Sequence, residues 1–172
     1  MKLEVGRLKP EISRFRLETS AEDLDLKTEG VQFISPIKAE VEITPSGDSF
    51  LVWVKIKANA RMECARCLLG FSAPIEAQFN MFIEKEKPGL EIDPESEDTI
   101  VITPQSKFID MSDRVRQAIA LSLPFKPLCS PDCRGLCHIC GADLNTSPCN
   151  CVAEEYDGRW DKLKHLLNKE EE

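Results

Sequence analysis

The sequence contains no run of apolar residues that approaches the roughly 20 needed to cross a membrane as a helix. Its first residues, MKLEVGRLKPEISRFRLE, also lack the apolar core of a signal peptide. These two absences predict a cytoplasmic protein. In that reducing compartment, the eight cysteines are expected to be thiols and not disulfides.

Signatures of common enzymes are missing as well. The sequence has no Gly-rich phosphate-binding loop, no HExxH helix and no Ser-His-Asp order. Of the two histidines, His138 is predicted to be an outward-pointing loop residue and His165 a surface residue of a helix. Neither has a recognisable nucleophile as partner, so we predict that the protein is not an enzyme.

Basic residues are too few for a broad nucleic-acid surface, because the formal net charge is −8. Acidic residues gather in Glu91–Asp98 and Lys169–Glu172, as is typical of a solvated loop and tail. The first stretch has the opposite sign, with five Lys or Arg against two Glu between Lys2 and Arg16. Local contacts to RNA phosphates therefore remain compatible with an acidic protein.

Three segments alternate between apolar and polar residues, which is the pattern of half-buried strands. They are residues 37–44, 50–62 and 71–83, and the first two are joined by a turn that contains Pro45 and Gly47. Their order predicts an antiparallel meander. A further short strand is predicted over Thr99–Thr103.

Two helices are predicted to follow. Asp110 or Ser112 can cap the first, which Pro124 ends. The second is expected from Asp157, with an apolar stripe formed by Trp160, Leu163, Leu166 and Leu167.

The predicted fold class is thus α+β, an antiparallel β meander with two helices and a Cys-rich zinc-binding loop near the C-terminus. Residues 1–128 would form the sheet core with one helix, and residues 129–172 a zinc-knuckle-like loop and C-terminal helix packed into the same domain.

Six of the eight cysteines lie between Cys129 and Cys151. The segment CHICG has the form of a zinc knuckle, in which two thiolates grip one ion and glycine permits the turn beneath it. The nearest pair that could complete a tetrahedron predicts a first Zn²⁺ site of Cys137, Cys140, Cys149 and Cys151. Cys129 and Cys133 could instead join that site, or could form a second site with Cys64 and Cys67. A structural zinc contributes on the order of 10 kcal/mol to the ordering of such a loop.

Other readings of these cysteines are open. Some thiols could be buried small apolar groups, and Cys64 and Cys67 also suit a hairpin tip without metal. The spacing Cys133-x3-Cys137-x2-Cys140 matches iron–sulfur enzymes that cleave S-adenosylmethionine, although those carry it early in a large α/β barrel. An iron–sulfur or thiol redox protein is therefore one alternative. A generic protein-interaction module that docks a partner through Trp160 is another.

Four segments in this order carry a resemblance to a known family: CARCL at 64–68, IALSLPFKPLC at 119–129, CRGLCHICGADLN at 133–145 and DGRWDKLKHL at 157–166. The chain resembles the bacterial and plastid family of large ribosomal RNA subunit accumulation proteins from about residue 37 to residue 167. The tail cysteines are not universal in that family, which fits a metal that stabilises a loop.

The resemblance implies a non-catalytic role in accumulation of the large-subunit ribosomal RNA, and hence in ribosome assembly. Precursor ribosomal RNA, a ribosomal protein or both would be bound, and the acidity favours a basic protein. Arg66 and Trp160 are the candidate partner-binding residues. The planar donors of Arg66 suit a phosphate or carboxylate, while a salt bridge or a neighbouring thiolate is the structural alternative for that residue.

Overall fold

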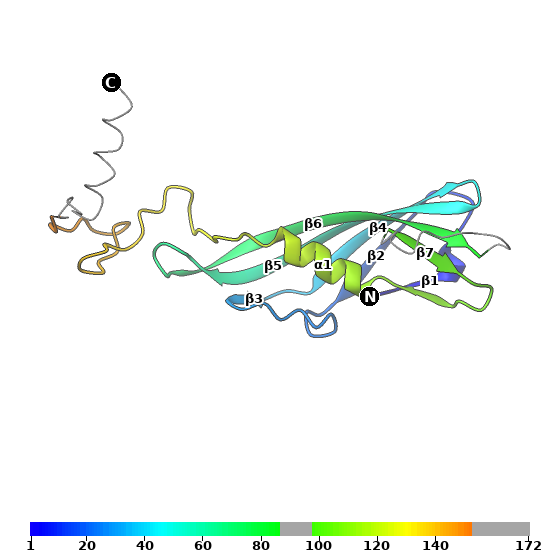
Figure 1. Ribbon diagram of the computed structural model, residues 1–172, viewed down its shortest axis with the longest axis horizontal. Helices are drawn as coiled ribbons and strands as arrows, with labels where there is room; N and C mark the ends of the chain where they lie inside the picture. The colour runs from blue at the N-terminus through cyan, green and yellow to red at the C-terminus, as the bar shows by residue number, and fades with distance from the viewer. Residues whose placement is uncertain (87–97, 153–172) are drawn as a thin grey trace, which may run out of the picture.

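A computed structural model of the chain describes residues 1–86 and 98–152, and Figure 1 shows how their elements are arranged. β-Strands are the main regular structure of these residues. The three longest strands follow one another in sequence: β4 (Ile37–Ser46), β5 (Ser49–Glu63) and β6 (Gly70–Lys85). They are the strands that the alternating pattern predicted.

These three strands pair antiparallel in a continuous meander. β4 and β5 form a hairpin that closes at Ser46 and Ser49, and its two-residue turn begins with Gly47 at φ +61°. Glycine adopts this left-handed conformation without steric cost, which a tight hairpin of this kind requires. β5 and β6 stay in register from Ser49 opposite Glu84 to Glu63 opposite Gly70. This long hairpin therefore extends from the sheet to a distant tip that contains Cys64 and Cys67.

Three shorter strands extend the sheet. β2 (Ser13–Thr19) pairs antiparallel with β4, and β3 (Val31–Phe33) pairs antiparallel with β5 beyond the end of β4. β7 (Thr99–Ile102) pairs parallel with β6, so the six-stranded sheet is mixed. A separate two-stranded sheet joins β1 (Lys2–Glu4) to β8 (Phe108–Asp110), and a short 3₁₀ helix, η1 (Val5–Arg7), follows β1.

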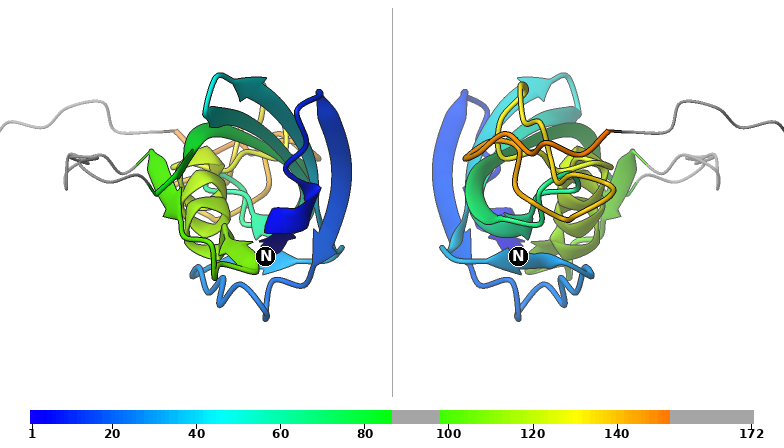
Figure 2. Two further views of the ribbon diagram at one scale, coloured as in Figure 1. Left: turned by 90° about the vertical axis from the view of Figure 1, so that its right-hand side faces the viewer. Right: turned by 90° about the vertical axis from the view of Figure 1, so that its left-hand side faces the viewer.

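The core lies between the concave face of the curved sheet and helix α1 (Ser112–Ser122), as the end-on views of Figure 2 show. Every second residue is buried from Ile37 to Ile43 in β4 and from Phe50 to Met62 in β5, because successive side chains of a strand point to opposite faces. Val115 and Ile119, one helical turn apart, face this core from α1 and are fully buried. The outer face of β4, β5 and β6 is left with mostly polar side chains and two exposed aromatic residues, Trp53 of β5 and Phe82 of β6.

The fold-class prediction was wrong in its helical part. Across residues 1–86 and 98–152 the structure has one α-helix, α1, and its other regular structure, apart from η1, is strand arranged in two sheets. The predicted second helix from Asp157, with Trp160, falls outside the described residues. The pattern also gave no sign of the parallel pairing of β7, because a short apolar strand carries no information on direction. Among the described residues, no helix has the length and apolarity needed to span a bilayer.

Candidate metal centres

The chain that follows α1 lies against the tip of the β5–β6 hairpin. Figure 1 shows the segment that contains residues 129–152 beyond this tip, at the far end of the molecule from β7. The backbone N–H of Ala65, in the tip, donates to the carbonyl of Pro127 at 2.8 Å. The two segments are distant in sequence, and their contact brings two groups of cysteines together.

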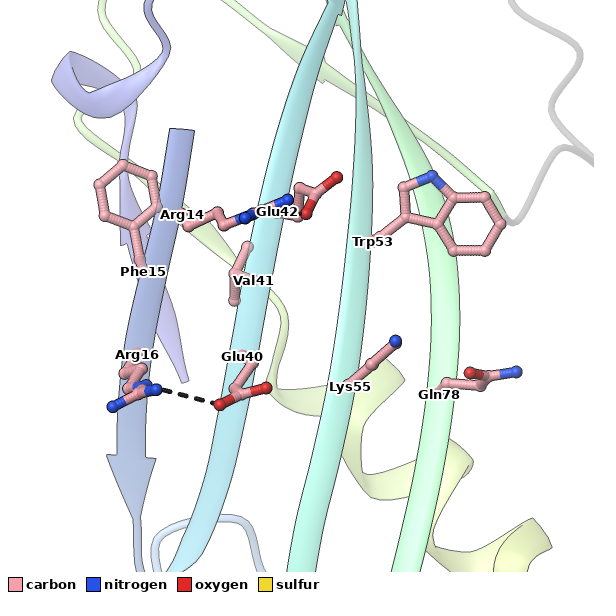
Figure 3. Close-up of a pocket in the computed structure, with 9 residues that line it drawn as sticks. All are labelled: Arg14, Phe15, Arg16, Glu40, Val41, Glu42, Trp53, Lys55 and Gln78. Carbon is pink, nitrogen blue, oxygen red and sulfur yellow. Dashed lines mark hydrogen bonds and ion pairs between the residues drawn. The ribbon is translucent and has the colours of Figure 1, made fainter. Parts of the chain in front are cut away.

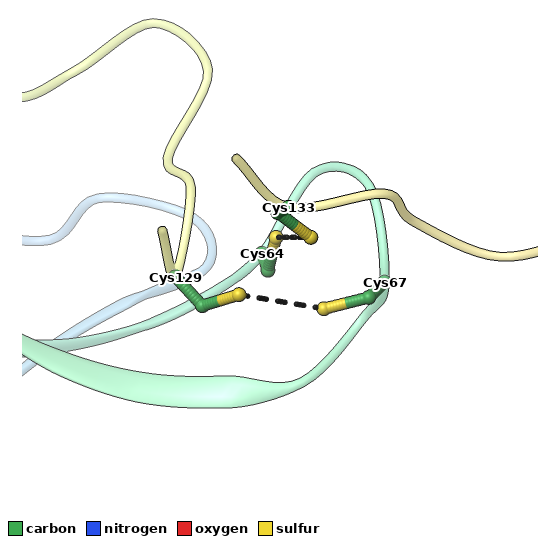
Figure 4. Close-up of side chains that lie close together, drawn as sticks. All are labelled: Cys64, Cys67, Cys129 and Cys133. Carbon is green, nitrogen blue, oxygen red and sulfur yellow. Dashed lines mark hydrogen bonds between the residues drawn. The ribbon is translucent and has the colours of Figure 1, made fainter. Parts of the chain in front are cut away.

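The first group, called site 1, consists of Cys64, Cys67, Cys129 and Cys133 (Figure 4). All four Sγ atoms lie within 4.8 Å of one another. The Sγ atoms of Cys64 and Cys133 are 3.8 Å apart, and those of Cys67 and Cys129 are 3.6 Å apart. Four sulfurs at about 2.3 Å from one tetrahedral ion stand about 3.8 Å apart, whereas a disulfide needs about 2.05 Å. The spacing therefore fits an ion and excludes disulfides.

Site 1 is also closed to solvent. Cys64, Cys67 and Cys133 are buried and Cys129 is half-buried. Phe71, Leu128 and Leu136 pack against the thiols. An ion in this position would take all four of its ligands from the protein, and that is the coordination of a structural site.

The second group, called site 2, consists of Cys137, Cys140, Cys149 and Cys151, whose Sγ atoms also lie within 4.8 Å of one another. It is more open than site 1, because Cys140 and Cys151 are exposed and Cys149 is half-buried. All of its members come from one short segment. Its geometry thus depends on local turns, whereas site 1 depends on the tertiary fold.

Both sites are built on the same backbone turn. In site 1, the N–H of Cys64 donates to the carbonyl of Leu69 at 2.9 Å, and the N–H of Leu68 returns to the carbonyl of Cys64 at 2.9 Å. In site 2, Cys137 donates to Ala142 and Gly141 donates to Cys137, each at 2.8 Å. The two hydrogen bonds join equivalent positions of the C-x-x-C segment in both sites, so both segments form the same zinc-knuckle turn.

The residue after the second cysteine has a left-handed backbone in both knuckles. Gly141 has φ +72°, as the CHICG motif predicted. Leu68 occupies the equivalent position at φ +59°, where a side chain other than glycine is strained. The sequence analysis missed this equivalence, because it took glycine as the mark of the turn. The shared C-x-x-C spacing was the signal that pointed to it.

The first cysteine of each knuckle is prepared to carry negative charge. Burial raises the pKa of Cys64, but hydrogen bonds from the backbone N–H groups of Cys129, Cys67 and Arg66 outweigh it and lower that pKa to about 6. Backbone N–H groups of Cys140 and Ile139 likewise lower the pKa of Cys137 to about 6. The Ile139 nitrogen is 3.4 Å from this sulfur.

In each site, a further thiol has a raised pKa. Burial and the neighbouring thiols raise the pKa of Cys129 to about 12. Hydrogen bonding to Cys140, together with burial, raises the pKa of Cys151 to about 12. Four thiols held this close cannot all be thiolates unless a cation neutralises their repulsion. Each set of four thiols could therefore hold a divalent cation, which would favour the thiolate form of all four.

Arg66 lies inside the first knuckle and holds the loop that completes site 1. Its guanidinium donates to the carbonyl of Cys133 at 2.7 Å and to that of Pro131 at 3.4 Å. The sequence suggested a phosphate or carboxylate of a partner, a salt bridge or a neighbouring thiolate for Arg66, whereas these contacts are to backbone carbonyls, one of them that of a cysteine of site 1. That Arg66 also meets a partner stays a prediction.

Asn145 connects the two sites. Its side-chain N–H donates to the Sγ of Cys133 in site 1 at 3.4 Å, and its Oδ1 accepts from the backbone N–H of Arg134 at 2.8 Å. Asn145 belongs to the loop between Cys140 and Cys149 of site 2. Groups that hydrogen-bond to metal ligands fix the position of those ligands. The sequence pattern gave no sign of this contact.

Gly135 allows the connection between the sites to cross the first knuckle closely. It has φ +76°, and a Cβ at this position would lie 2.9 Å from the carbonyl oxygen of Arg66. That carbonyl accepts from the N–H of Leu136 at 3.1 Å. A side chain at residue 135 would therefore push the segment away from site 1.

Replacing Gly135 by alanine tests this close approach. The Gly135→Ala change should destabilise the ordered segment 129–151 by roughly 1–3 kcal/mol, because it combines a left-handed backbone with a backbone clash. Hydrogen exchange over that segment measures the effect. Gly6→Ala is the matched control, since Gly6 has nothing within 4 Å of its Cβ position and should leave the segment unchanged. Equal protection in both variants would contradict the described packing.

The structure brings the eight sulfurs together as two sets of four. Site 2 has the four cysteines that the sequence predicted for the first zinc site. Site 1 has the four that it gave for a second site. Cys129 and Cys133 join Cys64 and Cys67, and do not replace members of site 2. Cys133, Cys137 and Cys140, whose spacing matches an iron–sulfur cluster motif, are divided between the two sets: Cys133 belongs to site 1 and the other two to site 2. Trp160 lies outside the described residues.

Comparison with known proteins gives the family. The model of the family described as "Large ribosomal RNA subunit accumulation protein YceD" matches residues 52–167, a range that begins in β5 and contains all eight cysteines. An uncharacterised protein of Mycobacterium tuberculosis is 31% identical over 150 residues, which cover 86% of this chain and 63% of that protein. No solved structure matches the chain.

Two plant relatives carry the family name. "Large ribosomal RNA subunit accumulation protein YCED homolog 1, chloroplastic" of Zea mays is 26% identical over 159 residues, covering 77% of this chain and 54% of that protein. Its namesake in Arabidopsis thaliana is 36% identical over 70 residues, covering 41% of this chain and 22% of that protein. The chain thus spans less than two thirds of the length of these relatives. By the extent of the family match, the chain belongs to the large ribosomal RNA subunit accumulation protein YceD family.

Proposed function

We propose that the protein is a non-catalytic ribosome-biogenesis factor that acts in the cytoplasm and supports accumulation of the large-subunit ribosomal RNA. The observation that carries this proposal is the family match over residues 52–167. The name of the family links it to large-subunit ribosomal RNA. The protein would bind precursor ribosomal RNA, a ribosomal protein or both.

We further propose that sites 1 and 2 each hold one structural Zn²⁺. Four-sulfur sets with tetrahedral spacing favour zinc among the divalent ions, or iron in a cluster. The cluster reading loses support because its triplet is divided between two sets. Each set supplies four protein ligands and so leaves no open position for substrate, which favours a structural role over a catalytic one.

Bound zinc would make the metal-binding part of the chain strongly anionic. An ion of charge +2 with four thiolates has a net charge of −2, so two such sites lower the formal net charge of the chain from −8 to about −12. Phosphates would be repelled from this region, whereas Lys- and Arg-rich protein segments would be attracted. This charge supports a basic ribosomal protein or assembly factor as the partner of the metal-binding part.

Elemental analysis of purified protein should give about two zinc equivalents per chain. Cys64→Ser removes a ligand of site 1, and Cys137→Ser removes a ligand of site 2. Each variant should therefore retain about one zinc equivalent per chain. Only Cys64→Ser should release the segment after Cys129 from the hairpin tip, as measured by limited proteolysis. A metal content near zero in wild-type protein, or a brown protein with visible absorbance, would contradict the assignment to zinc.

Depletion of the protein from cells tests the proposed function. The level of mature large-subunit ribosomal RNA should fall, with small-subunit RNA unchanged, and wild-type protein should restore it. The Cys64→Ser variant should fail to restore it, because the segment that carries site 2 would be misplaced. Normal large-subunit RNA in depleted cells would show that the chain does not have this role.

A further inference from the structure

The outer face of the sheet carries a groove that the metal sites do not explain (Figure 3). Its volume is about 870 Å³, within the range of roughly 300–1,000 Å³ that ligand sites occupy. The groove crosses β2, β4, β5 and β6. Its lining residues are Arg14, Phe15, Arg16, Glu40, Val41, Glu42, Trp53, Lys55 and Gln78.

Among the residues that line the groove, Trp53 is a large aromatic residue whose position is not explained by packing in the core. It is 45% exposed, on the face of β5 opposite the core. Its direct neighbours across the sheet are Glu42 and Asn80, both polar. Leu51 of β5 and the exposed Phe82 of β6 lie on the same outer face, so the face is not wholly polar. The Trp53 ring still points away from the core and contributes little to it. It offers a flat surface on which another ring can stack.

The groove is basic on an acidic protein. Three cations line it, Arg14, Arg16 and Lys55, against two carboxylates, Glu40 and Glu42. The carboxylates already pair with the arginines, Arg14 with Glu42 at 2.7 Å and Arg16 with Glu40 at 3.4 Å. Both arginine side chains are highly exposed, at 78% and 86%. Surface pairs of this kind are weak, so the guanidinium groups can also contact an incoming phosphate.

Lys55 has no ion pair with any residue in the described part of the chain. It stands two residues from Trp53 on the same face of β5, opposite Gln78 of β6. The groove therefore presents a stacking ring, an unpaired ammonium and a side-chain amide close together. Proteins that bind single strands use these three groups for bases, phosphates and base edges, respectively.

We propose that this groove binds single-stranded RNA, with a base stacked on Trp53 and the phosphate backbone beside Lys55, Arg14 and Arg16. The assignment extends the proposed function, because it gives precursor ribosomal RNA a place on the molecule. It does not depend on sites 1 and 2, which lie at the other end of the β5–β6 hairpin. Stacking would supply most of the affinity, since the protein as a whole repels phosphates.

Fluorescence anisotropy with a labelled ten-nucleotide RNA of mixed sequence tests the proposal on the zinc-loaded full chain. Trp53→Ala should weaken binding roughly 5- to 100-fold through loss of stacking, whereas Trp53→Phe should keep most of the affinity. The logarithm of the binding constant should fall with the logarithm of salt concentration with a slope of about −2, as expected for three cations on a single strand. Lys55→Gln should make this slope shallower by about 0.7.

Phe82→Ala is the matched control. Phe82 is an aromatic residue of β6 with 42% exposure, and it does not line the groove. The Phe82→Ala change should leave the RNA affinity within about twofold of wild type, as is usual for a surface substitution. No binding by wild-type protein, or equal losses in Trp53→Ala and Phe82→Ala, would overturn the proposal. Loss of a protein partner from nuclease-treated lysate by Trp53→Ala, with RNA affinity unchanged, would also overturn it and assign the groove to a protein.

The proposed function fails separately from this inference. Normal ribosomal RNA in depleted cells, together with RNA binding through Trp53, would refute the biological role and leave the groove assignment intact. A fall of large-subunit RNA on depletion, with no oligonucleotide bound, would refute the groove and leave the role intact.

Discussion

The approach of four thiols from two distant parts of the chain is the constraint on which the metal-binding region depends. Cys64 and Cys67 belong to the tip of the β5–β6 hairpin, and Cys129 lies 62 residues beyond Cys67. The sulfurs are too far apart for disulfides and too close to be thiolates without a cation. Within residues 123–152, the buried residues are Cys133, Gly135 and Cys137, and Phe125 is exposed, so the thiols are the main buried groups of this segment. The ion would thus replace a hydrophobic core.

The second site depends on the first for its position. Gly135 crosses the first knuckle, and Asn145 hydrogen-bonds to a sulfur of site 1 from within the loop of site 2. Arg66 holds the intervening loop by its carbonyls. The molecule therefore has two ends with different chemistry. One end carries the eight thiols, and the other includes a sheet face with a tryptophan among cations.

How much the sequence could predict follows from the range of each interaction. Strands β4, β5 and β6 were predictable because the alternation of apolar residues is local and long. The four cysteines of site 2 could be grouped from their spacing within one segment. The grouping of site 1 was one of several alternatives, because its cysteines meet only through a contact between distant parts of the chain. Leu68 in a left-handed turn and the sulfur contact of Asn145 were missed, because neither residue type is a signal for its role. The parallel direction of β7 was likewise outside what a local pattern can give.

X-ray absorption at the zinc edge counts the ligand atoms around the bound ion. If the eight cysteines close both sites, each zinc has four sulfur neighbours at about 2.3 Å and no nitrogen or oxygen neighbour. A coordination shell that contains water oxygen or histidine nitrogen would contradict this prediction. Such a shell would mean that the cysteines do not close the sites, and that the hairpin tip and the chain after α1 are held together in another way.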